Sequence, residues 1–416
     1  MRIVLSGYFG YDNVGDEAIL FSIIRALRKL EQTVELTVLS NNPAETAATY
    51  GVNSVNRWNI GEIRSALKKA DGLISGGGSL MQDATSTKTI PYYAGIIKLA
   101  QMAKVPVFIY SQGMGPIHGK LGKWLVKSVF NKSAGITVRD EASHTLLREI
   151  GVRLPVTVVP DPVVGLGGNE FTSPWLDEWL KTQFKADAEQ TEREEAEMNL
   201  HAADAANASD DAVTDMDAIS DDSVNDKDDP TEELQVSVTP PDYITVSVRD
   251  WPSEVDFKKK IAESLDLIAG RELHVVFIPM HGEHDVKASA DVAALMQSTS
   301  TIAPGDLSIE EKIAVIGGSK LLVGQRLHSL IFAAIEHIPF MALSYDPKID
   351  AFSNIAQQPI AGHVEKDDWT GQTLADLAFT ILDDYEAKVS ALIDIITPLQ
   401  TAAENTAQMA LDAFMK

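Results

Sequence analysis

An arginine and a histidine stand where an apolar strand gives way to an apolar helix. Residues 322–324 are typical of the end of a buried strand, Arg326 and His328 follow, and apolar residues at helical spacing resume at Leu330. In an open α/β sheet, ligands bind at the carboxyl ends of the strands. A guanidinium beside a titratable imidazole suits an anionic substrate whose reaction needs a proton transfer. A single histidine at a helix start is more often structural, so the pairing with Arg326 favours the functional interpretation.

Three loops in the first part of the chain also follow apolar strands and are rich in glycine and polar residues. Because a helix start there presents free backbone N–H groups, such a loop can bind an anion or a sugar hydroxyl. The spacing matches neither the dinucleotide fingerprint nor the phosphate-binding loop. The alternative for the first loop is a plain βα turn capped by Asp16. The loop residues of interest are Asn13, Asp16, Glu17, Gly76, Gly77, Gly78, Ser79 and Gln112.

Two further basic residues follow strands. Arg139 comes directly after an apolar run at residues 136–138, and Lys348 follows another at residues 340–344. A planar guanidinium binds carboxylate and phosphate oxygens well, although a local salt bridge from Arg139 to Asp140 or Glu141 fits the sequence equally. The segment 279–285 holds two histidines and an aspartate, but its spacing fits no zinc signature. We therefore expect a hydrogen-bonding loop with a helix cap there, and no metal.

These residues depend on an α/β architecture for their placement. Short β-rich apolar runs alternate with helical patterns, which predicts two Rossmann-like, doubly wound parallel sheets. We assign residues 1–175 to the first domain and residues 240–372 to the second. Residues 373–416 are expected to be helical, interrupted at Pro398, and to pack back toward the first domain. The predicted strands cover residues 3–5, 34–39, 72–75, 105–110, 136–138 and 156–159, then 243–248, 273–278, 321–323 and 340–344.

Residues 185–233 differ from the rest of the chain. They hold 18 Asp and Glu residues against three basic residues, and almost no aromatic residue. Such a segment buries too little apolar surface to offset the entropy lost on ordering. We therefore expect an acidic insertion that is disordered or loosely helical.

Composition narrows the class of protein. The formal net charge of -25 argues against nucleic-acid binding, which relies on Lys and Arg replacing counterions at phosphates. The chain of 416 residues has no cysteine, which excludes disulfides and thiolate chemistry and fits a reducing compartment. No signal peptide or spanning helix is apparent. A cytoplasmic protein follows as the expectation.

Blocks of sequence along nearly the whole chain outside the acidic insertion resemble one family. The sequence is similar to the polysaccharide pyruvyl transferases, and most closely to their bacterial cell-wall branch. The resemblance implies two Rossmann-like domains in a GT-B-like arrangement around a central cleft. The insertion departs from the family pattern, and Gln325 stands where methionine is expected. The blocks are residues 6–20, 74–83, 110–117, 137–142, 161–163, 247–251, 277–285, 326–334 and 342–351.

The resemblance also implies a reaction. Phosphoenolpyruvate would donate its pyruvyl group to two hydroxyls, O4 and O6, of a cell-wall sugar such as ManNAc, giving a cyclic ketal and phosphate. Arg139, Arg326, His328 and Lys348 would bind phosphoenolpyruvate, and His328 would also act as the general acid. Asp16 or Glu17 would accept a hydroxyl proton. The acceptor would contact Asn13, Gly76, Gly77, Gly78, Ser79 and Gln112.

The partners follow from the same resemblance. The acceptor would be a lipid-linked or nucleotide-linked glycan, and a lipid carrier would bring the protein to the inner membrane face without a spanning helix. No cofactor is expected beyond the donor substrate. Two alternatives stay open: a GT-B glycosyltransferase that uses a nucleotide sugar, since a fold does not settle function, and a non-catalytic glycan-binding protein.

Overall fold

The computed structural model describes residues 1–84, 86–167, 170–186, 193 and 241–415. The expected acidic insertion at 185–233 therefore lies almost wholly outside the described residues. The chain divides into two compact units, Met1–Ser173 with Asp242–Lys416, and Pro174–Pro241. In the second unit, residues 174–186 form a helix in which the rings of Trp175 and Trp179 stack 6.2 Å apart. No helix in the described part of the chain is long and apolar enough to cross a membrane.

Residues 2–158 build a seven-stranded parallel sheet in the order β3-β2-β1-β4-β5-β6-β7. This order, with the first strand at the centre and a reversal beside it, is that of a Rossmann fold. Its strands are β1 (Arg2–Phe9), β2 (Glu35–Ser40), β3 (Asn53–Asn56), β4 (Gly72–Gly76), β5 (Val107–Gln112), β6 (Gly135–Val138) and β7 (Thr157–Val158). Its helices are α1 (Val14–Leu30), α2 (Pro43–Tyr50), α3 (Ile60–Lys69), α4 (Thr89–Met102), α5 (Lys120–Phe130) and α6 (Glu141–Ile150), followed by the short 3-10 helix η1 (Pro162–Gly165).

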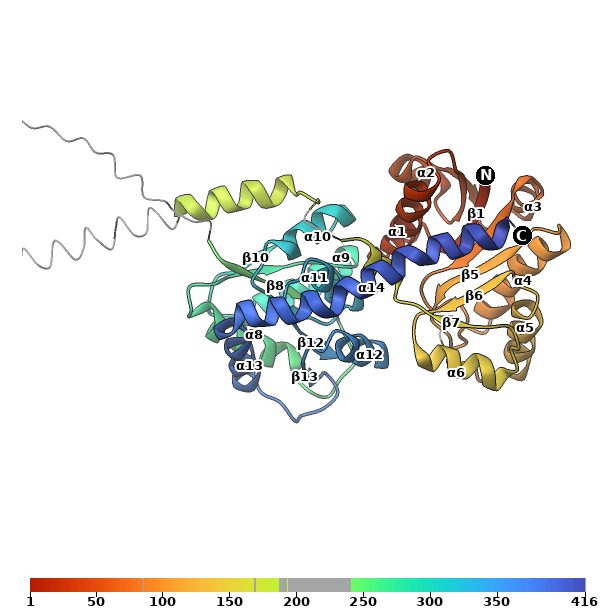
Figure 1. Ribbon diagram of the computed structural model, residues 1–416. Coiled ribbons are helices and arrows are strands. Elements are labelled where there is room, and N and C mark those ends of the chain that lie inside the picture. The colour runs from red at the N-terminus through yellow and green to blue at the C-terminus, as the bar shows by residue number, and fades with distance from the viewer. Residues whose placement is uncertain (85, 168–169, 187–192, 194–240, 416) are drawn as a thin grey trace, which may run out of the picture. The chain divides into compact units, whose positions relative to one another are not determined.

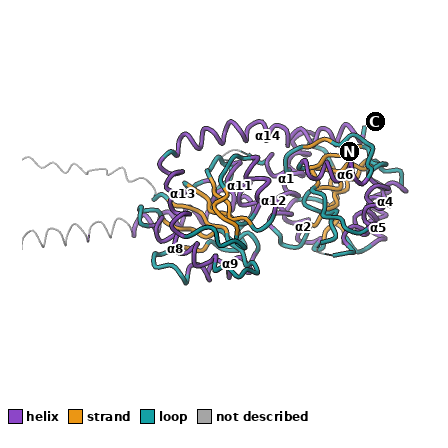
Figure 2. Tube along the Cα trace, turned by 90° about the horizontal axis from the view of Figure 1, so that it is seen from below, coloured by secondary structure: helices purple, strands orange, loops and turns teal. Residues whose placement is uncertain are grey.

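Residues 243–363 repeat the pattern in a six-stranded parallel sheet, in the order β10-β9-β8-β11-β12-β13. Helices again connect the strands, as the alternation in the sequence predicted (Figure 2). The strands are β8 (Tyr243–Ser247), β9 (His274–Phe277), β10 (Thr301–Ile302), β11 (Leu321–Gly324), β12 (Phe340–Ser344) and β13 (Ile360–His363). The helices are α8 (Phe257–Ala269), α9 (Gly282–Ala293), α10 (Ile309–Gly317), α11 (Leu327–Ile335) and α12 (Pro347–Ile355).

The sequence patterns missed three strands, β3, β10 and β13. Each is short, holds few apolar residues and lies at a sheet edge. Edge strands need no continuous apolar run, because only one side of their backbone is paired within the sheet. The start of α11 was also misplaced: the helix begins at Leu327 instead of Leu330, so His328 lies in its first turn.

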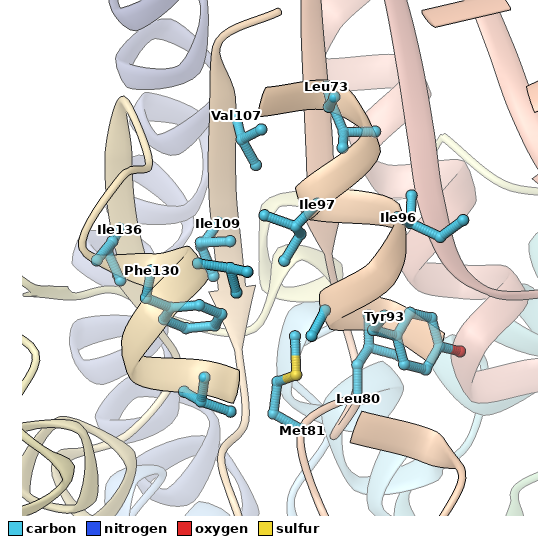
Figure 3. Packing of buried hydrophobic residues seen from close by; sticks show 14 of the residues in the cluster. Leu73, Leu80, Met81, Tyr93, Ile96, Ile97, Val107, Ile109, Phe130 and Ile136 are labelled. Carbon is cyan, nitrogen blue, oxygen red and sulfur yellow. The ribbon is translucent and has the colours of Figure 1, made fainter. Parts of the chain in front are cut away.

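The central strands of the first sheet are buried on both faces. Val107, Ile109 and Ile136 pack against Ile97 of α4 and Phe130 of α5 in one apolar cluster (Figure 3). Such two-sided burial explains why β5 is a nearly continuous apolar run in the sequence. Tyr93 lies at the edge of this cluster, and its hydroxyl points away from it (Figure 3).

Two helices complete the fold after the second sheet. Helix α13 (Gly371–Asp383) packs against α8, while α14 (Tyr385–Phe414) contacts η1, α1, β5 and β6 of the first sheet (Figure 1). The expected interruption at Pro398 was wrong, because α14 continues through this residue.

Candidate functional site

The loop between β1 and α1 separates two acidic residues by function. Asn13 caps α1, its Oδ1 accepting from the N–H of Gly15 at 3.2 Å, so the alternative in which Asp16 caps the helix is wrong. The carboxylate of Glu17 accepts from the Gly10 N–H at 2.7 Å and from the Tyr50 hydroxyl at 2.9 Å. Glu17 therefore fastens the loop to α2, whereas Asp16 spends no carboxylate oxygen on the cap.

Asp16 has the environment of a proton donor. Burial raises the pKa of its carboxyl to about 7, and the charge of Glu17 adds to the rise, while Arg139 and Lys348 act in the opposite direction. Burial disfavours the ionised form because the protein solvates a charge less well than water does. A carboxyl with a pKa of about 7 holds its proton in half of the molecules at neutral pH, as a general acid requires.

Three glycines make room for the side chains that meet at this point. A β-carbon on Gly15 would lie 2.2 Å from Nδ1 of His328, and one on Gly78 would lie 2.8 Å from Oδ1 of Asp16. A β-carbon on Gly113 would lie 2.8 Å from Nε of Arg139. These distances are shorter than van der Waals contact, so the glycines make room for side chains from α1, from α11 and from the residue that follows β6.

Gly76, at the end of β4, and Gly77, which follows it, make room for neighbouring core side chains and not for the residues of the site. A β-carbon on Gly77, whose φ is +76°, would lie 1.9 Å from Ile19, and one on Gly76 would lie 2.7 Å from Tyr110. Ser79, next in the loop, is exposed, and its Oγ accepts from Nη2 of Arg139 at 3.0 Å. Gln112, at the end of β5, is fully buried with both side-chain amide atoms lacking a partner.

Arg139 follows β6 and is mostly buried, with 12% of its side chain exposed. Its Nη1 lies 3.5 Å from Oδ2 of Asp161, and its Nε lies 3.6 Å from Oδ2 of Asp140. The local pair with Asp140 was anticipated from the sequence, but the contact with Asp161 was missed. Asp161 caps η1 by accepting from the Val163 N–H, a role that no spacing rule tied to Arg139.

His328 lies against Gly15 at the start of α1, although these two residues are far apart in the sequence. Burial lowers the pKa of its imidazole to about 4, Asp161 opposes this shift, and Arg139 and Lys348 add to it. Its Nε2 is buried and has no hydrogen-bond partner. The imidazole is therefore neutral at neutral pH. Lys348, in the first turn of α12, lies 3.3 Å from Asp346.

Arg326 is held differently from the other basic residues. Its Nε and Nη2 donate to Oδ2 and Oδ1 of Asp285 at 2.9 and 2.5 Å, leaving Nη1 for another acceptor. Asp285 is 1% exposed and also accepts from the Met280 N–H. The bidentate pair fixes the plane of the guanidinium. The expected hydrogen-bonding loop at residues 279–285 is thus the support of Arg326, a role that the sequence did not reveal.

Arg249 is a basic residue of this edge that the sequence patterns did not indicate. It follows β8, and its Nη1 donates to the Tyr345 hydroxyl at 2.8 Å. Its guanidinium also lies 4.5 Å from the centre of the Tyr345 ring and 5.2 Å from that of Trp251. Lys348 lies 5.8 Å from the same tyrosine ring. Tyr345 thus places Arg249 near Lys348, at the carboxyl edge of the second sheet.

The candidate site combines the positive charges of Arg139 and Lys348 with two groups that can transfer protons, Asp16 and His328. Arg139 and Lys348 influence the titration of both Asp16 and His328, so all four lie within electrostatic reach of one another. Such a site can bind a small anion, donate a proton from a carboxyl and accept one on an imidazole. Among residues 1–84, 86–167, 170–186, 193 and 241–415, no group of acidic and histidine side chains could hold a metal ion.

Comparison with known proteins identifies the family and the fold. The model of the family described as "Polysaccharide pyruvyl transferase" matches residues 13–347. A search of curated proteins gave no match.

Solved structures share the two-domain fold at low sequence identity. S. aureus MnaA with UDP is 14% identical (TM-score 0.59), over 100% of this chain and 98% of that one. Neisseria meningitidis UDP-GlcNAc 2-epimerase bound to UDP-GlcNAc is 13% identical (TM-score 0.56), over all of both chains. Anabaena Alr3699/HepE in complex with UDP-glucose is 11% identical (TM-score 0.57), over 99% of this chain and 98% of that one. The likeness shows the GT-B fold, two Rossmann-like domains, and nothing finer.

Proposed function

Because the chain belongs to the polysaccharide pyruvyl transferase family, we propose that it transfers the pyruvyl group of phosphoenolpyruvate to a glycan sugar as a cyclic ketal. The observation that carries this proposal is that His328 lies against Gly15, the neighbour of Asp16, with Arg139 and Lys348 within electrostatic reach of both acid–base groups. Phosphoenolpyruvate is a small polyanion whose enol carbon must gain a proton. The cluster offers both a place for the anion and a source for the proton.

The chemistry sets what the site must supply. Protonation of the methylene carbon of phosphoenolpyruvate makes the neighbouring carbon electrophilic, and a sugar hydroxyl then adds to it. A second hydroxyl of the same sugar replaces phosphate, which closes the ketal ring. Of the two hydroxyl protons, one ends on the new methyl group and the other on phosphate. One acid, one base and fixed positive charge around the departing phosphate are therefore needed.

The pKa shifts favour roles opposite to those expected from the sequence. With its pKa lowered to about 4, His328 is unprotonated at neutral pH, which is the state that a general base needs in order to accept a hydroxyl proton. With its pKa raised to about 7, Asp16 is suited to protonate the enol carbon. A bound polyanion would raise the pKa of Asp16 further and keep its proton in place. We therefore assign the acid role to Asp16 and the base role to His328, and leave Glu17 as a loop brace.

Donor binding falls to the basic residues. The charges of Arg139 and Lys348 act on both Asp16 and His328, and Arg326, aligned by Asp285, adds a guanidinium with Nη1 available. The acceptor side is formed by the loops of the first sheet, where the Gln112 amide is buried without a partner and Ser79 is exposed. The proposed acceptor is a lipid-linked or nucleotide-linked cell-wall glycan ending in ManNAc, modified at O4 and O6 on the cytoplasmic side of the membrane.

The direct test is incubation of the purified protein with phosphoenolpyruvate and a ManNAc-terminated glycolipid. Release of inorganic phosphate, together with an acceptor that gains one pyruvyl group by mass spectrometry, is the expected result. Asp16→Asn and His328→Gln should each abolish product. Phosphate release without a modified acceptor, or no reaction with any glycan ending in an N-acetylhexosamine, would argue against the proposal.

A glycosyltransferase that uses a nucleotide sugar is the second candidate. Its support is the likeness to Anabaena Alr3699/HepE, which was solved with UDP-glucose. A nucleotide released from a nucleotide sugar, with no phosphate released from phosphoenolpyruvate, would favour this candidate. Binding of glycans with neither reaction would favour the non-catalytic alternative.

A further inference from the structure

A buried arginine next to β3 is surrounded by aromatic rings. The guanidinium of Arg57 lies 4.6 to 5.8 Å from the centres of five rings, and 3% of the residue is exposed. Its Nη1 donates to the Gly7 carbonyl at 3.1 Å, and its Nη2 donates to the Tyr93 hydroxyl at 3.1 Å. The rings belong to Tyr8, Tyr11, Trp58, Tyr92 and Tyr93, and together with Arg57 they are called the Arg57 cluster below.

The charge of Arg57 is balanced without a carboxylate among the described residues. A cation over the face of an aromatic ring is attracted by the ring quadrupole, by ~0.5–2 kcal/mol for each favourable pair. Several such contacts, with the two hydrogen bonds, hold the rings in place around one fixed centre. The Tyr92 hydroxyl adds a bond to the Arg57 carbonyl at 2.9 Å. The Arg57 cluster is therefore rigid.

Two rings of this rigid cluster face solvent. Trp58 is 60% exposed and Tyr8 is 41% exposed, although large aromatic residues usually bury most of their surface. The Trp58 ring is nonetheless fixed, because its Nε1 donates to Oδ1 of Asn41 at 3.3 Å and its ring lies 5.0 Å from that of Tyr92. Tyr8 stacks on Tyr11 at 4.1 Å with nearly parallel rings. Core packing explains the buried rings of the cluster but not the exposed ones.

The cluster adjoins the proposed reaction centre. Tyr8 is near the end of β1, Tyr11 lies on the loop that leads from β1 to α1, and Glu17 holds this loop through Gly10. The charge of Asp16 contributes to raised pKa values at both Tyr8 and Tyr93, so the carboxyl lies within electrostatic reach of the cluster. A glycan that presents a hydroxyl to Asp16 and continues along the β1–α1 loop would reach these rings.

We infer that the exposed faces of Trp58 and Tyr8 bind a pyranose ring of the acceptor glycan, next to the sugar that receives the pyruvyl group. This inference rests on the proposed function and deepens it. A pyranose has an apolar face of C–H groups that packs on an aromatic ring, and a rim of hydroxyls that needs polar partners. Two amide side chains lie beside the ring, because Oδ1 of Asn56 accepts from the Trp58 backbone N–H and Oδ1 of Asn41 accepts from its Nε1.

The surroundings favour a sugar over a membrane surface. Membrane-binding faces combine apolar side chains with Lys and Arg that attract anionic lipids. Here the basic residue is buried under the rings, the neighbours are asparagines, and the chain carries a net charge of -25. The test below includes vesicles, so that contact with lipid is one of its outcomes.

The experiment compares two exposed tryptophans. Trp58→Ala is paired with Trp124→Ala, because Trp124 on α5 is 62% exposed and lies in the same sheet domain. Binding of a soluble ManNAc-containing oligosaccharide is measured by calorimetry without phosphoenolpyruvate. We expect Trp58→Ala to weaken binding about tenfold, Trp58→Phe to retain most of it, and Trp124→Ala to leave it unchanged. Because Trp58 is at the surface, thermal melting should show that the variant is folded.

Kinetics separate this inference from the proposed function. Trp58→Ala should raise the acceptor KM about tenfold and leave the phosphoenolpyruvate KM unchanged. If oligosaccharide binding depends on Trp58 but the protein never releases phosphate, the sugar-binding role of Trp58 and Tyr8 stands and the proposed transferase activity is wrong. If Trp58→Ala transfers pyruvyl groups with an unchanged acceptor KM, the proposed transferase activity stands and the inference about Trp58 and Tyr8 is overturned. If Trp58→Ala no longer pellets with lipid vesicles but keeps its affinity for the oligosaccharide, these rings bind a membrane surface and not a sugar.

Discussion

Replacement of Asp16 by asparagine is expected to stabilise the protein at neutral and alkaline pH while abolishing activity. The carboxyl has its pKa raised from 3.8 to about 7, chiefly by burial. That difference is about 3 pK units, and each unit corresponds to ~1.4 kcal/mol of free energy. Full ionisation would then cost the folded state about 4 kcal/mol. Because Asp16 keeps partial contact with solvent, we expect a measured effect of about 2–4 kcal/mol.

The direction of the pH dependence follows from proton binding. Between pH 4 and 7 the unfolded chain has lost the Asp16 proton and the folded protein has kept it. The free energy of unfolding therefore falls as pH rises through this range, and the loss is complete above the folded pKa of about 7. Asparagine cannot ionise, so the variant should match the wild type near pH 4, exceed it increasingly up to about pH 7, and keep a constant advantage at higher pH.

Thermal melting from pH 4 to 8.5 measures this difference. At pH 8 the melting temperature of Asp16→Asn should lie about 5 °C or more above that of the wild type. Asp12→Asn is the matched control, because Asp12 lies on the same loop but is exposed. A gap between Asp16→Asn and the wild type that did not change with pH would refute the reasoning. A gain of stability with full activity would remove Asp16 from the reaction.

Three further substitutions test the geometry. His328→Gln should abolish turnover. Because the pKa of His328 is lowered to about 4, the wild type loses stability as the pH falls from 6.5 to 4, and in acid-unfolding curves the variant should lose about 2–3 kcal/mol less. Gly15→Ala should lower kcat about 100-fold, because the new methyl group would lie 2.2 Å from Nδ1 of His328; Gly95→Ala, where no atom lies within 4 Å, should be harmless, and equal activity of the two would contradict this. Arg326→Lys should raise the KM for phosphoenolpyruvate about tenfold, because lysine lacks the fork that Asp285 aligns; an unchanged KM would show that Arg326 serves only Asp285.

The order of elements could be predicted from the sequence. Buried parallel strands such as β5 and β12 are continuous apolar runs, and the helices between them have clear amphipathic spacing. Short edge strands carry no such signal, which is why β3, β10 and β13 were missed. The continuation of α14 through Pro398 was also not predictable, because packing against the first sheet outweighs the local cost of a proline.

The sequence by itself determined which residues could do chemistry. Arg139, Arg326, His328 and Lys348 each follow an apolar strand, and parallel strands carry whatever follows them to the same edge of a sheet. The sequence likewise placed Asp16 and Glu17 together at the start of a helix. Local patterns reach no further than this, because they concern neighbours along the chain.

Only the tertiary structure decided what each residue does. It gives Glu17 to Tyr50, Arg326 to Asp285 and part of Arg139 to Asp161, while it brings His328 against Gly15 across 313 positions of sequence. It also gathers five aromatic rings around Arg57. The physical reason is that burial and the charges of distant residues set a side chain's partners and pKa. Asp16 and Glu17 are adjacent in sequence, yet folding makes one a brace and the other a carboxyl that titrates near neutrality.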